Sequence, residues 1–134
     1  MKEFATETGT LEFARAAIEQ KKIMPSHFRK AQGLTLSSLG MGTYLGSLDT
    51  KTDLDVELAI RDSISSGAIN VIDTAINYRF QRAERRVGRA LNSLFEEQVA
   101  SREQVFVSTK NGYLAPDADY ERGFGKYVAS WHST

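Results

Sequence analysis

Hydrophobic positions in the middle of the chain alternate between strand-like and helix-like spacing. An apolar run over residues 68–75 is typical of a strand that is buried on both faces. Apolar residues spaced three and four apart over 56–64 and 83–94 predict two amphipathic helices, one before that strand in the chain and one after it. Apolar segments at 39–46 and 104–110 predict two further strands. The resulting βαβαβ order predicts a parallel sheet with right-handed crossovers.

The residues before this sheet predict two short elements, a helix and a hairpin. Apolar residues at helical spacing predict a helix over 8–22, and Pro25 is expected to end whatever precedes it because proline disfavours helix at the residue before it. Residues 27–38 predict a small hairpin that turns at Gly33.

Caps and breaks mark the ends of the predicted elements. Asp53 or Thr52 can cap the helix that contains 56–64, and Gly67 lies just past its end. Beyond Lys110 the periodicity disappears, and the remaining residues predict a loop and an irregular tail.

Composition and charge narrow the classes of function. The chain has 134 residues, 41% of them hydrophobic and 25% charged, which is a globular composition. Seventeen basic and 17 acidic side chains give zero net charge, which disfavours a nucleic-acid or anionic-membrane partner. The basic pairs Lys21–Lys22 and Arg85–Arg86 are therefore expected to be solvated. Cysteine is absent, no apolar run could span a membrane and the N-terminus lacks a signal-peptide core, so the expected location is the cytoplasm.

Candidate chemistry gathers where the predicted strands end. Asp73 lies near the end of the second strand, Lys110 follows the third, and Tyr78 comes five residues after Asp73. Neighbouring strands lie about 4.8 Å apart, so these side chains can meet at one edge of the sheet. A phenol is a weak proton donor at neutral pH, but a lysine cation beside it favours its ionised form, and an aspartate can hold that lysine. Such a trio can protonate a carbonyl oxygen while a hydride arrives at the carbonyl carbon.

Three ordered motifs carry a resemblance to a known family. The chain resembles the N-terminal part of the aldo-keto reductase superfamily over roughly residues 26–115, in GMGTYLG, NVIDTAINYRFQRAERRVGRAL and VFVSTK. The resemblance implies a (β/α)8 barrel that reduces aldehyde or ketone carbonyls of small molecules with NADPH. A complete barrel takes about 250 residues, so this chain would hold only part of one.

The resemblance also implies roles for individual residues. Tyr78 matches the family's proton donor, Lys110 the lysine that activates it, and Asp73 the aspartate that anchors the lysine. Thr43 and Tyr44 match residues that line the cofactor side of the site, although packing within the barrel explains them equally well.

The chain also departs from the family pattern. Arg79 stands where many members have glycine, and Glu84 comes later than their Ser-Glu pair. The family's catalytic histidine follows a strand, but His132 has no apolar strand before it and His27 precedes the first barrel strand, so neither histidine is assigned that role.

The predicted fold is α/β, the N-terminal portion of a TIM barrel with about three βα units, preceded by a short helix and a hairpin. The predicted division is a helical extension over 1–25, a partial barrel over 26–115 and an irregular tail over 116–134. Two functions remain open. One is an NADPH-dependent carbonyl reductase of which this chain is an inactive N-terminal fragment. The other is a non-catalytic partial-barrel module that acts by self-association or partner binding, and the reading frame beyond Thr134 would distinguish the two.

Overall fold

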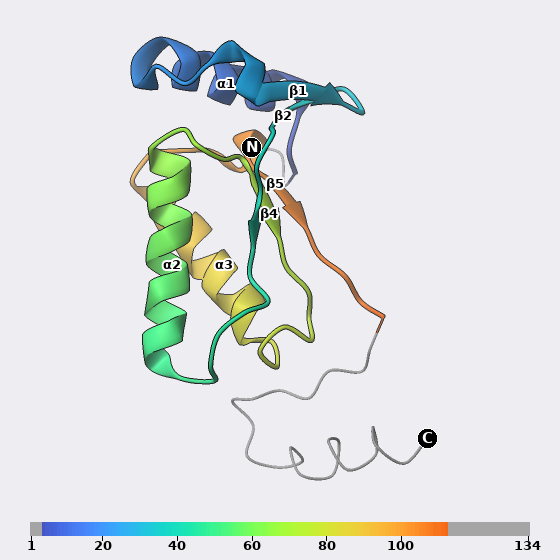
Figure 1. The fold of residues 1–134 in the computed structure, drawn as a ribbon, viewed down its shortest axis with the longest axis vertical. Helices are drawn as coiled ribbons and strands as arrows, with labels where there is room; N and C mark the ends of the chain where they lie inside the picture. Colours follow the sequence, from blue (N-terminus) through green and yellow to red (C-terminus); the bar gives the residue numbers. More distant parts are fainter. Residues whose placement is uncertain (1–3, 113–134) are drawn as a thin grey trace.

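A three-stranded parallel sheet lies at the centre of the computed structural model, which describes residues 4–112. The sheet order is β3 (Met41–Gly42), β4 (Val71–Asp73) and β5 (Phe106–Ser108), with β4 in the middle. Helices α2 (Thr50–Ser65) and α3 (Arg82–Glu96) connect the strands, and Figure 1 shows both on one side of the sheet. The predicted βαβαβ order is confirmed, although each strand is shorter than its apolar segment. The predicted tail over 116–134 and His132 lie outside the described residues.

The N-terminal elements lie across the end of the sheet at which the strands begin (Figure 1). They are α1 (Glu7–Lys21), the short helix η1 (Pro25–His27), β1 (Phe28–Ala31) and β2 (Leu34–Ser37), with α1 packed near the short helix η2 (Arg102–Gln104). The predicted hairpin is confirmed: β1 and β2 pair antiparallel. Gln32 and Gly33 form its turn with φ angles of 50° and 83°, the left-handed pair that two-residue hairpin loops favour.

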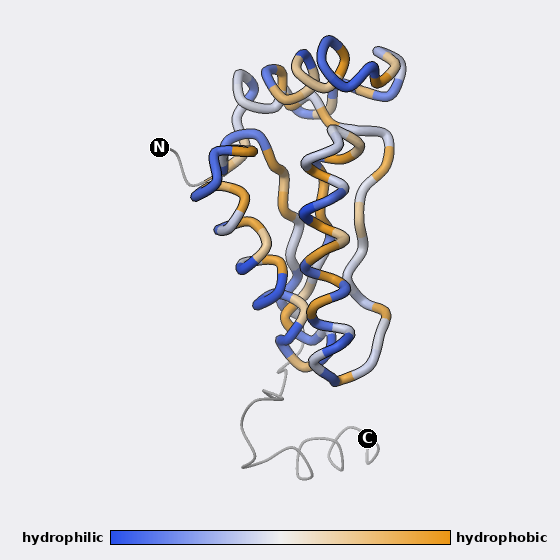
Figure 2. Tube along the Cα trace, turned by 90° about the vertical axis from the view of Figure 1, so that its left-hand side faces the viewer, coloured by the Kyte–Doolittle hydropathy of each residue, from blue (hydrophilic) through white to orange (hydrophobic). Residues whose placement is uncertain are grey.

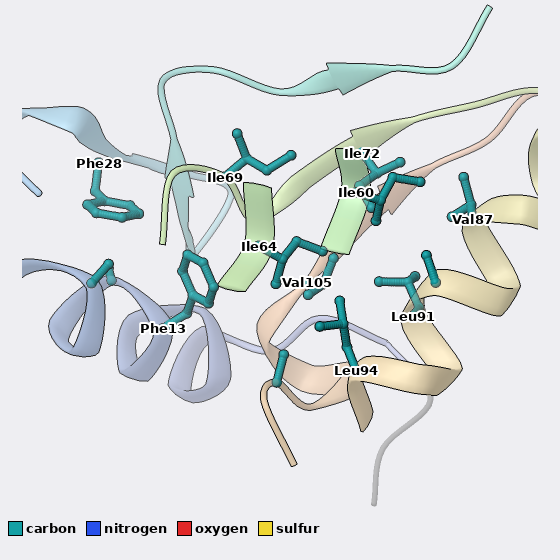
Figure 3. Packing of buried hydrophobic residues seen from close by; sticks show 14 residues of the cluster. Phe13, Phe28, Ile60, Ile64, Ile69, Ile72, Val87, Leu91, Leu94 and Val105 are labelled. Atoms are coloured by element: carbon teal, nitrogen blue, oxygen red, sulfur yellow. The ribbon is translucent and has the colours of Figure 1, made fainter. Parts of the chain in front are cut away.

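Hydrophobic side chains of α2 and α3 fill the space between these helices and the sheet. Figure 2 shows the hydrophobic residues of α3 on its side toward α2, with hydrophilic residues on the other side. Leu91 and Leu94 of α3 point toward Ile60, Ile72 and Val105 (Figure 3). Burial of each such side chain contributes about 1.5–3 kcal/mol to the stability of the fold. The five apolar positions predicted for this helix stripe are all buried: Ala83, Val87, Ala90, Leu91 and Leu94.

The opposite face of the sheet is more open. Side chains alternate along a strand, so Val71 and Asp73 point away from the helices that cover Ile72. Val71 pairs with Phe106, and both are only partly buried. Within residues 4–112 no helix lies over this face (Figure 1). The run 68–75 was predicted to be buried on both faces, but here it is covered on one.

The start of α2 differs from the sequence prediction. Its N-cap is Asp49, whose carboxylate accepts a hydrogen bond of 2.7 Å from the backbone N–H of Thr52. Neither Thr52 nor Asp53 is the cap, because Asp49 stands one residue before the helix and its side chain accepts from one of the free N–H groups. Asp53 lies inside the first turns and is fully buried. Gly67, just past the helix end as predicted, has a φ of +78°.

Candidate active site

The ends of two neighbouring strands bring the predicted site residues to one edge of the sheet. Asp73 is the last residue of β4 and pairs with Ser108, the last residue of β5. Backbone hydrogen bonds continue past both strands, from Thr74 N–H to the Ser108 carbonyl and from Ile76 N–H to the Lys110 carbonyl. This continued pairing holds Lys110 beside the segment that leaves β4.

The ammonium of Lys110 joins the three side chains. Lys110 Nζ donates to Asp73 Oδ1 at 2.5 Å, to the Thr74 carbonyl at 2.9 Å and to the Tyr78 hydroxyl oxygen at 3.3 Å. All three protons of the ammonium thus have acceptors, which fixes its position. The hydrogen bond to Asp73 raises the pKa of Lys110, partial desolvation opposes the shift, and the contact with Tyr78 adds to it. Lys110 is therefore a cation at neutral pH.

The charged side chains of the site are partly exposed to solvent. The side chains of Lys110 and Asp73 are 49% and 44% exposed, and Tyr78 is half-buried between them and Tyr44. The rings of Tyr44 and Tyr78 meet edge to face with centroids 5.1 Å apart. Tyr44 is itself exposed, so its ring lies at the surface beside Tyr78.

Thr43 and Tyr44 lie differently, although both follow β3. The Thr43 side chain is buried and its hydroxyl donates to the carbonyl of Asp73 at 3.1 Å, so it ties the ends of β3 and β4 together. Tyr44 lies on the surface beside Tyr78. A cofactor-binding role stays a prediction for both residues.

A buried charge cluster behind the Tyr78 loop was not predicted from the sequence. Asp53 accepts hydrogen bonds from Arg79 and Arg82 and forms an ion pair with Arg86 at 3.1 Å. Arg86 also donates to Glu57, so the expectation that the Arg85–Arg86 pair is solvated is wrong for Arg86. The sequence does hold one signal for this cluster. Arg82 and Arg86 are four residues apart, and residues four apart share a face of a helix.

The arginines determine the charge state of this carboxylate. Burial alone would raise the pKa of Asp53, but hydrogen bonds from Arg82 and Arg79 and the charge of Arg86 outweigh burial and hold the pKa below its usual range. Asp53 is therefore ionised at neutral pH.

The remaining candidate groups lie elsewhere or do not cluster. His27 lies at the other end of the sheet, where its ring nitrogens contact the Ala68 carbonyl and the Ser38 hydroxyl.

Among residues 4–112, no three His, Asp or Glu side chains converge so that they could hold a metal ion. No helix of that same stretch is both long enough and apolar enough to cross a bilayer.

Comparisons with known proteins identify the family of this chain. The model of the aldo/keto reductase family matches residues 38–133, well over half of the chain. The chain belongs to the aldo/keto reductase family. This match begins after the hairpin, so α1, β1 and β2 lie outside it.

A curated relative agrees with this membership of the aldo/keto reductases. The chain is 40% identical over 85 residues to the NADH-specific methylglyoxal reductase of Escherichia coli strain K12. That alignment covers 60% of this chain and 24% of the relative, so the chain spans about a quarter of the relative's length. No solved structure gives a significant match. The relative's name specifies NADH and methylglyoxal for that protein.

Proposed function

We propose that this chain supplies the proton-donating part of the active site of a carbonyl reductase that uses a reduced nicotinamide dinucleotide. The observation that carries the proposal is the contact of Lys110 Nζ with both Asp73 and the hydroxyl oxygen of Tyr78. In this role Tyr78 is the proton donor, Lys110 activates it and Asp73 anchors Lys110.

The direction of the Lys110 hydrogen bond suits this chemistry. Lys110 donates to the phenol oxygen, so the hydroxyl proton of Tyr78 is free to point at a substrate. When the Tyr78 O–H bond breaks and a new O–H bond forms on the carbonyl oxygen, the phenolate left behind lies 3.3 Å from a cation. This charge contact stabilises the phenolate as it forms and lowers the barrier to proton transfer.

The residues present fit a nicotinamide cofactor at the reacting end. A bound reduced nicotinamide would supply the hydride that the carbonyl carbon receives. Tyr44 offers an exposed aromatic ring beside Tyr78 on which a flat ring or a substrate can lie. The family resemblance implies NADPH, whereas the relative's name specifies NADH, so the reaction class is proposed with either dinucleotide.

The sheet and its helices are proposed to form the first units of a (β/α)8 barrel. The support is the β3-α2-β4-α3-β5 order, the parallel pairing and the placement of both helices on one side of the sheet. In such a barrel the partly buried Val71 and Phe106 would face the packed interior. The site would lie at the carboxyl ends of the strands, where barrel enzymes carry their catalytic groups.

A non-catalytic module is the second candidate, favoured by apolar groups left at the surface. Leu54 and Leu58 are four residues apart on α2 and more than half exposed, and β3 and β5 have no partner strand on their outer edges within residues 4–112. Such features promote self-association. Size-exclusion chromatography that gives a dimer or larger species without any reductase activity would support this candidate.

The test of the reductase proposal is an assay of the full-length protein. Loss of reduced-nicotinamide absorbance is followed with NADH and with NADPH in the presence of methylglyoxal and of a simple aldehyde. We expect carbonyl-dependent oxidation of at least one dinucleotide and an alcohol product. Absence of oxidation with both dinucleotides and both substrates, from a folded protein, would overturn the proposal.

A further inference from the structure

The buried cluster around Asp53 lies directly behind the loop that carries Tyr78, and the proposed chemistry does not use it. Asp53 is fully buried, and the Arg79 side chain beside it is 2% exposed. Arg79 Nη1 donates to Asp53 Oδ1 at 2.8 Å, while Arg82 donates to Asp53 Oδ2 through two nitrogens. Buried charges of this kind are costly unless they are paired, so the cluster depends on Asp53.

Arg79 connects the cluster to the candidate active site. It follows Tyr78 directly in the chain, and the same Nη1 also donates to the carbonyl of Ser47 at 3.5 Å. Ser47 belongs to the loop that carries Tyr44. One guanidinium therefore connects Asp53 with the two loops whose tyrosine rings touch.

The backbone of this loop has a rare conformation. Arg79, Phe80 and Gln81 have φ angles of 48°, 53° and 71°, three consecutive non-glycine residues in the left-handed region. That region is unfavourable for residues with a Cβ and persists only where surrounding contacts maintain it. The ion pair of Arg79 with Asp53 is such a contact, because it buries the side chain of the first of the three residues.

Close packing leaves this arrangement little freedom. A Cβ at Gly46 would lie 2.3 Å from Thr52 Cγ2, so the loop after β3 approaches the first turn of α2 as only glycine allows, and it would lie 3.7 Å from Arg79 Cδ, at ordinary contact distance. Gly46 itself has a φ of +119°.

We propose that Asp53 is a positioning residue for Tyr78 and acts through Arg79. The hydroxyl oxygen of Tyr78 lies 3.3 Å from Lys110 Nζ, near the upper limit for a hydrogen bond, so a small shift of the loop would break this contact. With Asp53 in place Arg79 stays buried, the left-handed turn is maintained and the phenol stays within reach of Lys110. The catalytic consequence rests on the proposed function, whereas the effect on the position of Tyr78 does not.

The first experiment measures the position of Tyr78 without any activity. Tyrosines in the full-length protein are labelled with ¹³C at Cζ, and the Tyr78 resonance is assigned from its loss in Tyr78→Phe. We expect Asp53→Asn and Arg79→Gln to shift or broaden this resonance to a similar degree. The control Asp55→Asn removes an exposed carboxylate of the same helix, which contacts Lys51, and should leave it unchanged.

A second control separates positioning from general stability. Arg86→Gln also removes a partner of Asp53, but Arg86 lies in α3 rather than in the Tyr78 loop. It should lower the melting temperature and leave the Tyr78 resonance in place. A Tyr78 resonance that is unchanged in folded Asp53→Asn, or that moves equally in Arg86→Gln, would overturn the proposal.

Kinetics of the full-length reductase give the catalytic readout. We expect Asp53→Asn to lower kcat about ten- to a hundredfold with KM changed less than about threefold, because a misplaced donor slows the proton step. The solvent deuterium isotope effect on kcat should rise, whereas partial unfolding would leave it unchanged. The double variant Asp53→Asn with Arg79→Gln should be no slower than Arg79→Gln alone, and additive losses would contradict action through Arg79.

If Asp53→Asn does not fold, variants of Arg79 still test the proposal. Arg79→Lys keeps a cation beside Asp53, so it should retain more of the kcat and of the native Tyr78 resonance than Arg79→Gln. Equal behaviour of these two variants would count against the proposal. If Tyr78→Phe retains full activity the proposed function fails, while the resonance measurements still decide whether Asp53 positions Tyr78.

Discussion

The two ends of the parallel sheet use polar side chains in opposite ways. At the end where the strands begin, Asn70 is fully buried and its amide contacts Ser37 N–H and the carbonyls of Thr35 and Gln104. At the end where the strands finish, Lys110 and Asp73 form an ion pair and are nearly half exposed. The first arrangement joins the hairpin to the sheet, whereas the second presents a polarised phenol to solvent.

This difference separates stability from chemistry along the strand direction. Asn70 uses both side-chain donors and its acceptor on neutral backbone groups, so its side-chain donors are not available to a ligand. Tyr78 receives a hydrogen bond from Lys110 and keeps its own proton available. Substitutions at the two ends should therefore affect different measurements.

The largest effect is expected from loss of the cation at the site. Lys110→Met in the full-length protein removes the charge that is proposed to stabilise the Tyr78 phenolate, and we expect kcat/KM for carbonyl reduction to fall about a hundredfold or more. Lys51→Met is the control, because Lys51 is 83% exposed and pairs only at the surface with Asp55. A Lys110→Met protein with activity close to that of Lys51→Met would contradict the assignment.

At the other end, Asn70→Ala should affect stability alone. It leaves Ser37 N–H and two carbonyls without their buried partner, so we expect a loss of about 3 kcal/mol in the free energy of unfolding. Denaturant unfolding measures this loss, with the exposed Asn92→Ala on α3 as the control. The rate of reduction per folded molecule should not change. A fall in the rate per folded molecule would show that the two ends are coupled.

A smaller effect concerns the pH range of the site. The hydrogen bond to Asp73 raises the pKa of Lys110, so this pair contributes stability at pH values below the ordinary lysine pKa of about 10.4 and loses it as the pH rises through the raised value. Asp73→Asn should move the pKa of Lys110 downward. ¹⁵N spectra of the lysine ammonium groups, recorded across the alkaline range, measure the direction. An unchanged or higher pKa in Asp73→Asn would mean that another group holds Lys110.

Much of the fold follows from the sequence because its signals are local. The α3 stripe and the hairpin turn at Gly33 each depend on spacing within one segment, and the structure shows both. The strand ends that carry Asp73 and Lys110 follow from the βαβαβ order, since parallel strands end at one edge.

The parts that the sequence did not predict depend on contacts between segments. Asp53 looked like a helix cap because capping is a local pattern, but its partners Arg79, Arg82 and Arg86 come from a loop and a helix well over twenty residues later. Arg86 was likewise expected to be solvated, because the zero net charge of the chain was the only guide. Only packing of α2 against α3 brings these groups together and buries them.

We propose that Tyr78, and not the tyrosine beside it, donates the proton. Tyr44 and Tyr78 have ring centroids 5.1 Å apart, but the hydroxyl of Tyr78 is the one that lies 3.3 Å from Lys110. The most direct test compares single-turnover carbonyl reduction by Tyr78→Phe and Tyr44→Phe in the full-length protein. We predict at least about a hundredfold slower reduction for Tyr78→Phe and less than about a threefold change for Tyr44→Phe. Near-normal reduction by Tyr78→Phe, or an equal loss in both variants, would contradict the claim.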